Sequence, residues 1–176
     1  MKKILAAIAL MLIAAGSMAA APASPAQKEL PPKIHAEVKR LAAQGDSLAE
    51  AGKYPEAIPI YWKAWDLLPE PKQNWDAALW ILAAVGDANF HNKDYTACRD
   101  NLSVAMHTPG ATANPFLHLR LGQCQFELRN MDRAADELAR AYLPEGKAIF
   151  KDDDPKYLAF IKSKLKPPPA GWPAGW

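Results

Sequence analysis

Apolar side chains recur every three or four residues along most of this chain after residue 32, as in helices that bury one face. The segment 54–68 carries Ala57, Ile58, Tyr61, Ala64 and Trp65 on one side. The expected helices span 33–51, 54–68, 72–91, 95–106, 115–128, 133–142, 145–150 and 156–165. No segment shows the alternation of apolar and polar residues that is typical of a strand, so the sequence predicts an all-α fold.

Several helix starts carry a capping signal. Asp94, Asn114 and Asp132 are expected to cap the helices that follow them, and Pro115 suits a first helical position. The acidic run 152–154 is expected to cap the last helix in the same way.

A set of residues recurs in three copies in register. Each copy has a glycine, a small residue twelve positions later, a large residue at sixteen, an alanine at nineteen and a chain breaker at twenty-four. The copies are Gly45, Ala57, Tyr61, Ala64 and Pro69; Gly86, Cys98, Leu102, Ala105 and Gly110; and Gly122, Ala134, Leu138, Ala141 and Gly146. Three copies predict three helix-turn-helix units that stack, with an atypical unit at the end of the chain.

The glycines indicate close packing within each unit. A glycine inside a helix costs about 1 kcal/mol relative to alanine, so its presence suggests a near neighbour. We expect this neighbour to be the small residue twelve positions later, which is Cys98 for Gly86. Successive glycines are 41 and 36 residues apart, and we expect the extra length in the connection 70–75.

The repeated set resembles the tetratricopeptide repeat (TPR), a helix-turn-helix unit of about 34 residues. The first unit carries the resemblance best, through Gly45, Tyr54, Ala57, Tyr61, Ala64 and Pro69, and the resemblance covers residues 33–146. It implies a right-handed superhelix of three helix-turn-helix units plus a C-terminal capping helix.

The chain departs from the TPR pattern at two positions of the unit. Three residues after each glycine, where an aromatic residue is expected, it has Leu48, Asn89 and Gln125. Four residues before each glycine, a large apolar residue is expected, and the third unit has His118 there.

By that resemblance, the first helix of each pair lines a groove that binds another protein. The expected lining residues are Lys39, Asp46, Glu50, Trp80, Asp87, Phe90, His91, Phe116, Leu119, Gln123, Phe126 and Glu127. Aromatic side chains supply buried area, and carboxylates orient a partner by pairing with its Lys or Arg. Packing between helices is the alternative role of the aromatic residues, and a solvated helix face is the alternative for Asp46 and Asp87.

The chain begins as exported proteins do. Lys2 and Lys3 precede an apolar run at 4–15 that is too short to span a bilayer. Small residues follow, with cleavage expected after Ala19 or Ala23. The sequence predicts a cleaved signal peptide at 1–23 and a periplasmic protein, and an uncleaved membrane anchor is the alternative.

Two segments flank the expected helical domain at 33–165. Residues 24–32 are rich in Pro and Ala and are expected to form a flexible linker. Residues 166–176 form a Pro-rich tail that is expected to be disordered. Its Trp172 and Trp176 suit either docking to a partner or folding back on the last helix.

Loss of the signal peptide leaves balanced charge. The full chain has 21 basic and 19 acidic residues, and Lys2 and Lys3 leave with the signal, so 19 of each sign remain. This balance gives no electrostatic footprint for nucleic acid or anionic lipid. We expect a protein partner, no nucleic acid and no stable membrane anchor after cleavage.

Cys98 and Cys124 are the two cysteines of the chain, and both fall on apolar helix faces. An even count in an oxidising compartment favours a disulfide. Two buried thiols that pack as small apolar groups are the alternative.

The sequence shows no catalytic or metal-binding motif. The histidines, at positions 35, 91, 107 and 118, have no metal-ligand spacing, and no phosphate-binding loop or nucleophile elbow is present. We expect neither a metal nor another cofactor, and a binding protein rather than an enzyme.

Three stretches resemble a narrower group of proteins. They are LLPEPKQNWDAALWILAAVGDANF, NPFLHLRLGQCQFELRNMDRA and AYLPEGKAIFKDDDPKYLAFI, and they are similar to small bacterial TPR proteins among the candidate immunity proteins of polymorphic or contact-delivered toxins. The resemblance implies a protein that binds and neutralises a toxin in the periplasm. An envelope assembly scaffold or adaptor without an inhibitory role is the alternative.

Overall fold

The computed structural model describes residues 29–167, 169 and 171, and within these residues the chain is helical and has no strand. The α-helices are α1 (Pro32–Glu50), α2 (Tyr54–Asp66), α3 (Asp76–His91), α4 (Tyr95–Ala105), α5 (Pro115–Glu127), α6 (Met131–Glu145) and α7 (Pro155–Lys164). Short 3-10 turns are η1 (Lys72–Asn74), η2 (Ala111–Ala113) and η3 (Gly146–Phe150). The all-α prediction is confirmed.

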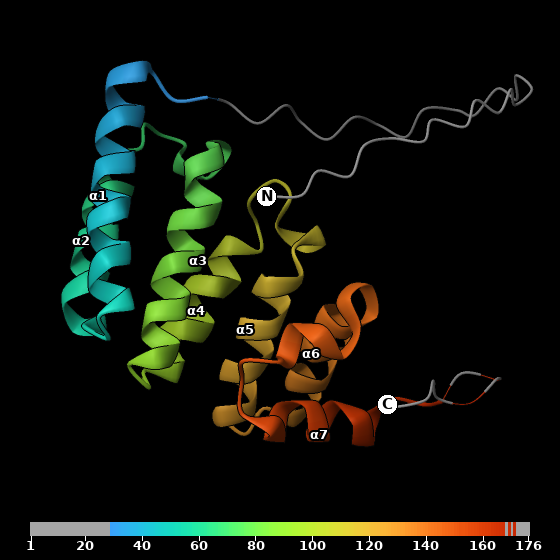
Figure 1. Cartoon of the computed structure of the whole chain (residues 1–176). Helices are drawn as coiled ribbons and strands as arrows, with labels where there is room; N and C mark the ends of the chain where they lie inside the picture. Colours follow the sequence, from blue (N-terminus) through green and yellow to red (C-terminus); the bar gives the residue numbers. More distant parts are fainter. Residues whose placement is uncertain (1–28, 168, 170, 172–176) are drawn as a thin grey trace, which may run out of the picture.

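The first six helices form three successive pairs. The pairs α1–α2, α3–α4 and α5–α6 stand side by side in chain order, and α7 crosses the end of the third pair (Figure 1). The three units expected from the sequence are therefore present, and α7 closes the stack.

Side-chain caps fix three of the helix starts. Carboxylate or amide oxygens of Asp94, Asn114 and Asp154 accept hydrogen bonds from backbone N–H groups in the first turns of α4, α5 and α7. These three predictions are confirmed. The prediction for Asp132 is wrong, because α6 begins at Met131 and Asp132 lies inside its first turn.

The single helix expected over 72–91 is interrupted. Residues 72–74 form η1, Trp75 is extended and α3 begins at Asp76. The indole N–H of Trp75 donates to the carbonyl of Pro69 at 2.7 Å, and Lys72 Nζ donates to the carbonyl of Trp65 at 3.2 Å. These bonds hold the connection against the end of α2, so a continuous helix cannot form there.

The extra length of the first repeat lies in the helices. The connection 67–75 is as long as the equivalent connection 106–114. Instead, α2 has 13 residues against 11 in α4, and α3 begins ten residues before Gly86 whereas α5 begins seven before Gly122. The expectation of a longer connection at 70–75 is therefore wrong.

Each repeat glycine lies under a large side chain of the second helix in its unit. A Cβ placed on Gly86 would lie 2.5 Å from Leu102 Cγ, and one on Gly122 would lie 2.7 Å from Leu138 Cγ. A Cβ on Gly45 would meet the ring of Tyr61. The close neighbour is thus the residue sixteen positions later, and the expected neighbour at twelve, Cys98 for Gly86, is wrong.

A disulfide joins the second and third units. Cys98 on α4 and Cys124 on α5 are bonded, with their Cα atoms 6.3 Å apart, and both residues are fully buried. Of the two alternatives for these cysteines, the structure has the disulfide.

The described domain begins before the expected boundary. Leu30 is only 7% exposed and packs in the core with Val38 and Ala77, and α1 starts at Pro32. These residues therefore belong to the fold and not to a linker. The expected signal peptide at 1–23, residues 24–28 of the expected linker, Trp172 and Trp176 lie outside the described residues. Within the part described, no helix is long and apolar enough to cross a membrane.

Candidate functional site

The facing sides of α1 and α3 form a hollow near their N-terminal ends. This N-terminal hollow has a volume of about 530 Å³. Its lining residues are Glu29, Leu30, His35, Lys39, Ala42, Ala43, Asp46, Asp76, Ala77 and Trp80. Those on α1 and α3 follow helical spacings of three and four, so each helix contributes one face.

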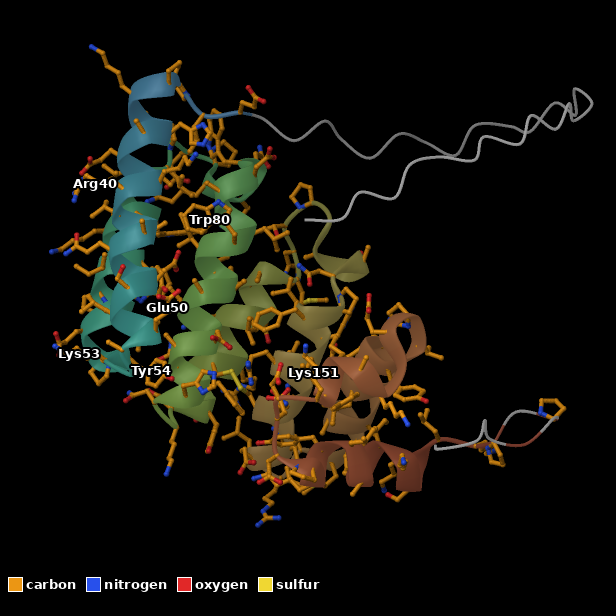
Figure 2. The ribbon with its side chains drawn as sticks, viewed as in Figure 1. Arg40, Glu50, Lys53, Tyr54, Trp80 and Lys151 are labelled. Carbon is orange, nitrogen blue, oxygen red and sulfur yellow. A yellow bond between two sulfur atoms is a disulfide. The ribbon has the colours of Figure 1, made fainter. Side chains whose placement is uncertain are left out.

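A second hollow continues along the same helices and reaches α5. This central hollow has a volume of about 260 Å³. It is lined by Asp46, Ala49, Glu50, Tyr61, Ala83, Ala84, Asp87, Ala88 and Phe116. Asp46 lines both hollows, so the two form one hollowed surface, which we call the open face. Trp80 and Glu50 mark its course along α1 and α3 (Figure 2).

Two aromatic rings remain accessible on the open face. Trp80 is 36% exposed and Phe116 is 38% exposed, although both are large apolar side chains. Alanines from α1 and α3 form much of the floor between them. A partner can therefore bury aromatic area without first displacing a side chain of the core.

Asp46 is oriented by a hydrogen bond from the second helix of its unit. The hydroxyl of Tyr61 donates to Asp46 Oδ1 at 2.8 Å. Burial of Tyr61 and this hydrogen bond raise the pKa of its phenol far above the ordinary value, so the hydroxyl stays protonated. Within the part of the chain that the structure describes, the side chains of Lys39 and Glu50 make neither a hydrogen bond nor an ion pair.

The face closes at α5, where a buried arginine ties three segments together. Arg120 Nε lies 2.7 Å from Asp87 Oδ1 on α3, and Nη1 lies 3.2 Å from Asp153 Oδ1, just before α7. Nη1 also donates to Gln123 Oε1 at 2.7 Å. The guanidinium lies 4.2 Å from the ring centre of Phe90. Arg120 therefore occupies the place where the groove would continue into the third unit.

The start of α7 covers the C-terminal end of α5. Tyr157 donates its hydroxyl proton to Glu127 Oε1 at 2.6 Å, and Lys156 Nζ lies 2.7 Å from the same oxygen. The rings of Tyr157 and Phe160 pack edge-on against Phe126. Burial alone would raise the pKa of the Glu127 carboxyl, but the bonds from Lys156 and Tyr157 outweigh it and hold that pKa below its usual value.

The structure divides the expected groove residues into two groups. The open face contains Lys39, Asp46, Glu50, Trp80, Asp87 and Phe116. The other six expected groove residues line neither hollow. They are Phe90, His91, Leu119, Gln123, Phe126 and Glu127.

Each member of the second group has another contact. Leu119 and Gln123 are buried, and Phe126 and Glu127 lie beneath α7. Phe90 packs among Arg120 and neighbouring aromatic rings, so helix packing, the alternative role, applies to it. His91 stacks on Tyr54 of the first unit, with ring centres 5.1 Å apart.

Sequence reasoning missed Arg120 as the residue that closes the groove. It lies two positions before Gly122, where the other units have Ala43 and Ala84. An arginine at a position otherwise occupied by alanine was the available signal. The alanine floor was missed as well, because alanines on a helix do not distinguish the floor of a groove from ordinary helix packing.

His118 replaces the expected large apolar residue of the third unit. It is buried, and its Nδ1 lies 2.6 Å from Glu137 Oε2 on α6 while its Nε2 lies 3.0 Å from the carbonyl of Thr112. His118 thus joins α5 to α6 by polar contacts. Within the described residues, no group of three or more His, Cys, Asp or Glu side chains is arranged to hold a metal.

Neither a family model nor a curated protein matches this chain. Among solved structures it is similar to the first TPR domain of the human RPAP3 protein, with a TM-score of 0.58 and 20% identity over 74% of this chain and 96% of that domain. The chain has a TPR-like fold.

A second TPR domain of human RPAP3, solved in complex with the HSP70 peptide SGPTIEEVD, is also similar in structure. Its TM-score is 0.56, with 16% identity over 76% of this chain and 99% of that chain. At this identity the likeness concerns the TPR-like fold alone.

Proposed function

We propose that this protein is an exported, non-enzymatic module that binds another protein through its open face. The observation that carries the proposal is the exposure of Trp80 and Phe116 in adjoining hollows on α1, α3 and α5. Exposed aromatic side chains in a hollow are typical anchors of protein interfaces. The TPR-like fold supports this, since one of the similar TPR domains was solved with a peptide of another protein.

Two observations support export to the periplasm. The first is the signal-like start of the sequence, with Lys2, Lys3 and the apolar run 4–15. The second is the Cys98–Cys124 disulfide, because disulfides persist in oxidising compartments and are rare in the cytosol.

The more specific form of the proposal is an immunity protein that neutralises a toxin in the periplasm. It is supported by the resemblance of three sequence stretches to candidate immunity proteins. An envelope assembly adaptor uses the same open face without inhibiting its partner, so the identity of the bound protein separates the two functions.

An affinity pulldown from the envelope fraction of the native cell tests the proposal. The bait is the tagged mature protein, and the control bait carries Trp80→Ala. We expect one partner in equimolar amount with the native bait and its loss with the variant. A toxin-like partner supports the immunity function, and several envelope-assembly proteins support the adaptor. Recovery of no stoichiometric partner would contradict the proposed function.

A further inference from the structure

We infer that the open face accepts an extended partner segment that carries Lys or Arg residues beside apolar ones. This inference rests on the proposed protein-binding function and adds the chemical class of the segment. It follows from the charges and the shape of the two hollows, taken together with the way the third unit is closed.

Carboxylates outnumber cations along the open face. The N-terminal hollow has Glu29, Asp46 and Asp76 against Lys39, with His35 also in the lining. The central hollow adds Glu50 and Asp87, and its lining includes no Lys or Arg. The balanced charge of the mature chain is therefore not reproduced locally, because this surface has an acidic excess.

The acidic excess is only partly neutralised within the fold. Arg120 pairs with Asp87 from the closed side of the central hollow, at 2.7 Å. Asp46 accepts one hydrogen bond, from the neutral hydroxyl of Tyr61. Among the described residues, no side chain makes an ion pair or a hydrogen bond with the Glu50 carboxylate. A cationic side chain of a partner would satisfy these oxygens, whereas an acidic segment would meet repulsion.

The shape of the face favours an extended segment with apolar side chains between its charges. The floor consists largely of alanines, such as Ala42, Ala77 and Ala84, so the bottom of each hollow is apolar while its rim is charged. Trp80 and Phe116 lie in different hollows that meet at Asp46. A single extended segment can therefore contact both rings and place a cation near Asp46 and Glu50.

Three nonapeptides that differ only at their sixth, seventh and ninth positions, and carry different charges there, test the inference. They are the acidic SGPTIEEVD, the basic SGPTIKKVK and the neutral SGPTIQQVN, each labelled with a fluorophore and titrated with the mature protein by anisotropy. We expect the basic peptide to bind about tenfold more tightly than the acidic one at low salt, and this preference to shrink as salt is added.

Two charge-reversal variants locate the effect. Glu50→Lys should weaken the basic peptide about fivefold and strengthen the acidic one, because the reversed charge lies in the central hollow. Glu145→Lys is the matched control, since Glu145 is exposed at the end of α6 and lines neither hollow. It should leave both affinities unchanged.

Three results would overturn the inference: equal or tighter binding of the acidic or neutral peptide, an equal effect of the two variants, or no binding of any peptide. The pulldown separates this failure from failure of the proposed function. A stoichiometric partner without a basic preference would leave the function standing, whereas the absence of any partner would contradict the function itself.

Discussion

Arg120 shows how one side chain changes a binding surface. Its guanidinium contacts carboxylates from α3 and from the segment before α7, and it lies over the ring of Phe90. Arginine suits this place because its planar group carries several donors in fixed directions. The same side chain that stabilises the third unit also ends the open face.

Removal of the Arg120 side chain should destabilise the protein strongly. Arg120→Ala leaves Asp87 and the mostly buried Asp153 without their cation, which costs about 3 kcal/mol of unfolding free energy. Urea denaturation measures the loss. Arg140→Ala is the control, because its ion pair with Asp136 is exposed and should contribute less than about 1 kcal/mol. Equal losses in the two variants would contradict the role given to Arg120.

Glycine should be needed at position 86 because Leu102 packs directly against it, and not because α3 needs a glycine there. In an open helix, Gly86→Ala would stabilise by about 1 kcal/mol. Here the added methyl would lie 2.5 Å from Leu102 Cγ, so we expect a net loss of about 1–3 kcal/mol from overpacking. In the Leu102→Ala background the same substitution should cost nothing. Additive losses in a double-mutant cycle, measured by urea denaturation, would refute this coupling.

At the scale of elements, α7 is the helix whose position determines how far the groove extends. Its contacts with α5 pass through Tyr157, Lys156 and Glu127, across a sequence separation of about thirty residues. The exposed fraction of Lys156 is 42%, so the hydroxyl bond from Tyr157 contributes more to docking than the ion pair does.

Acid should weaken the docking of α7. The pKa of Glu127 lies below its ordinary 4.5 in the folded protein, so its contribution is complete above that value and is lost as pH falls through the lower folded pKa. Glu127→Gln should therefore cost about 1 kcal/mol at neutral pH and progressively less below pH 4.5. Urea denaturation across this pH range measures how the difference in unfolding free energy between the native protein and the variant shrinks. A difference in unfolding free energy that does not change with pH would contradict the role given to Glu127. The control is Glu145→Gln, at an exposed position, which should leave the unfolding free energy unchanged across this range.

The helix pairs could be predicted because their signals are local. Apolar spacing located the helices, and the caps at Asp94 and Asn114 located two starts. The interruption at Trp75 could not be predicted, since it depends on an indole bond to Pro69. The contact between Gly86 and Leu102 was also missed. Cys98 and Leu102 lie about one turn apart on the same helix, so the sequence does not show which of them faces the glycine.

At the scale of the whole molecule, the repeat stack has an open part and a closed part. The first two units and Phe116 provide the open face, and α7 with Arg120 fills the third. The repeat pattern placed six of the expected groove residues on this face. It could not place Leu119 or Gln123, because equivalent positions in a repeat are equally exposed only when each unit has the same neighbours.

Site-specific photocrosslinking in the native cell tests the open face most directly. The substitution Trp80→p-benzoylphenylalanine puts the probe in the N-terminal hollow, and Val104→p-benzoylphenylalanine puts it at an exposed position on α4, outside both hollows. We expect one specific protein adduct from position 80 and none from position 104. The same adduct from both positions, or an adduct from position 104 alone, would show that the partner does not bind the open face.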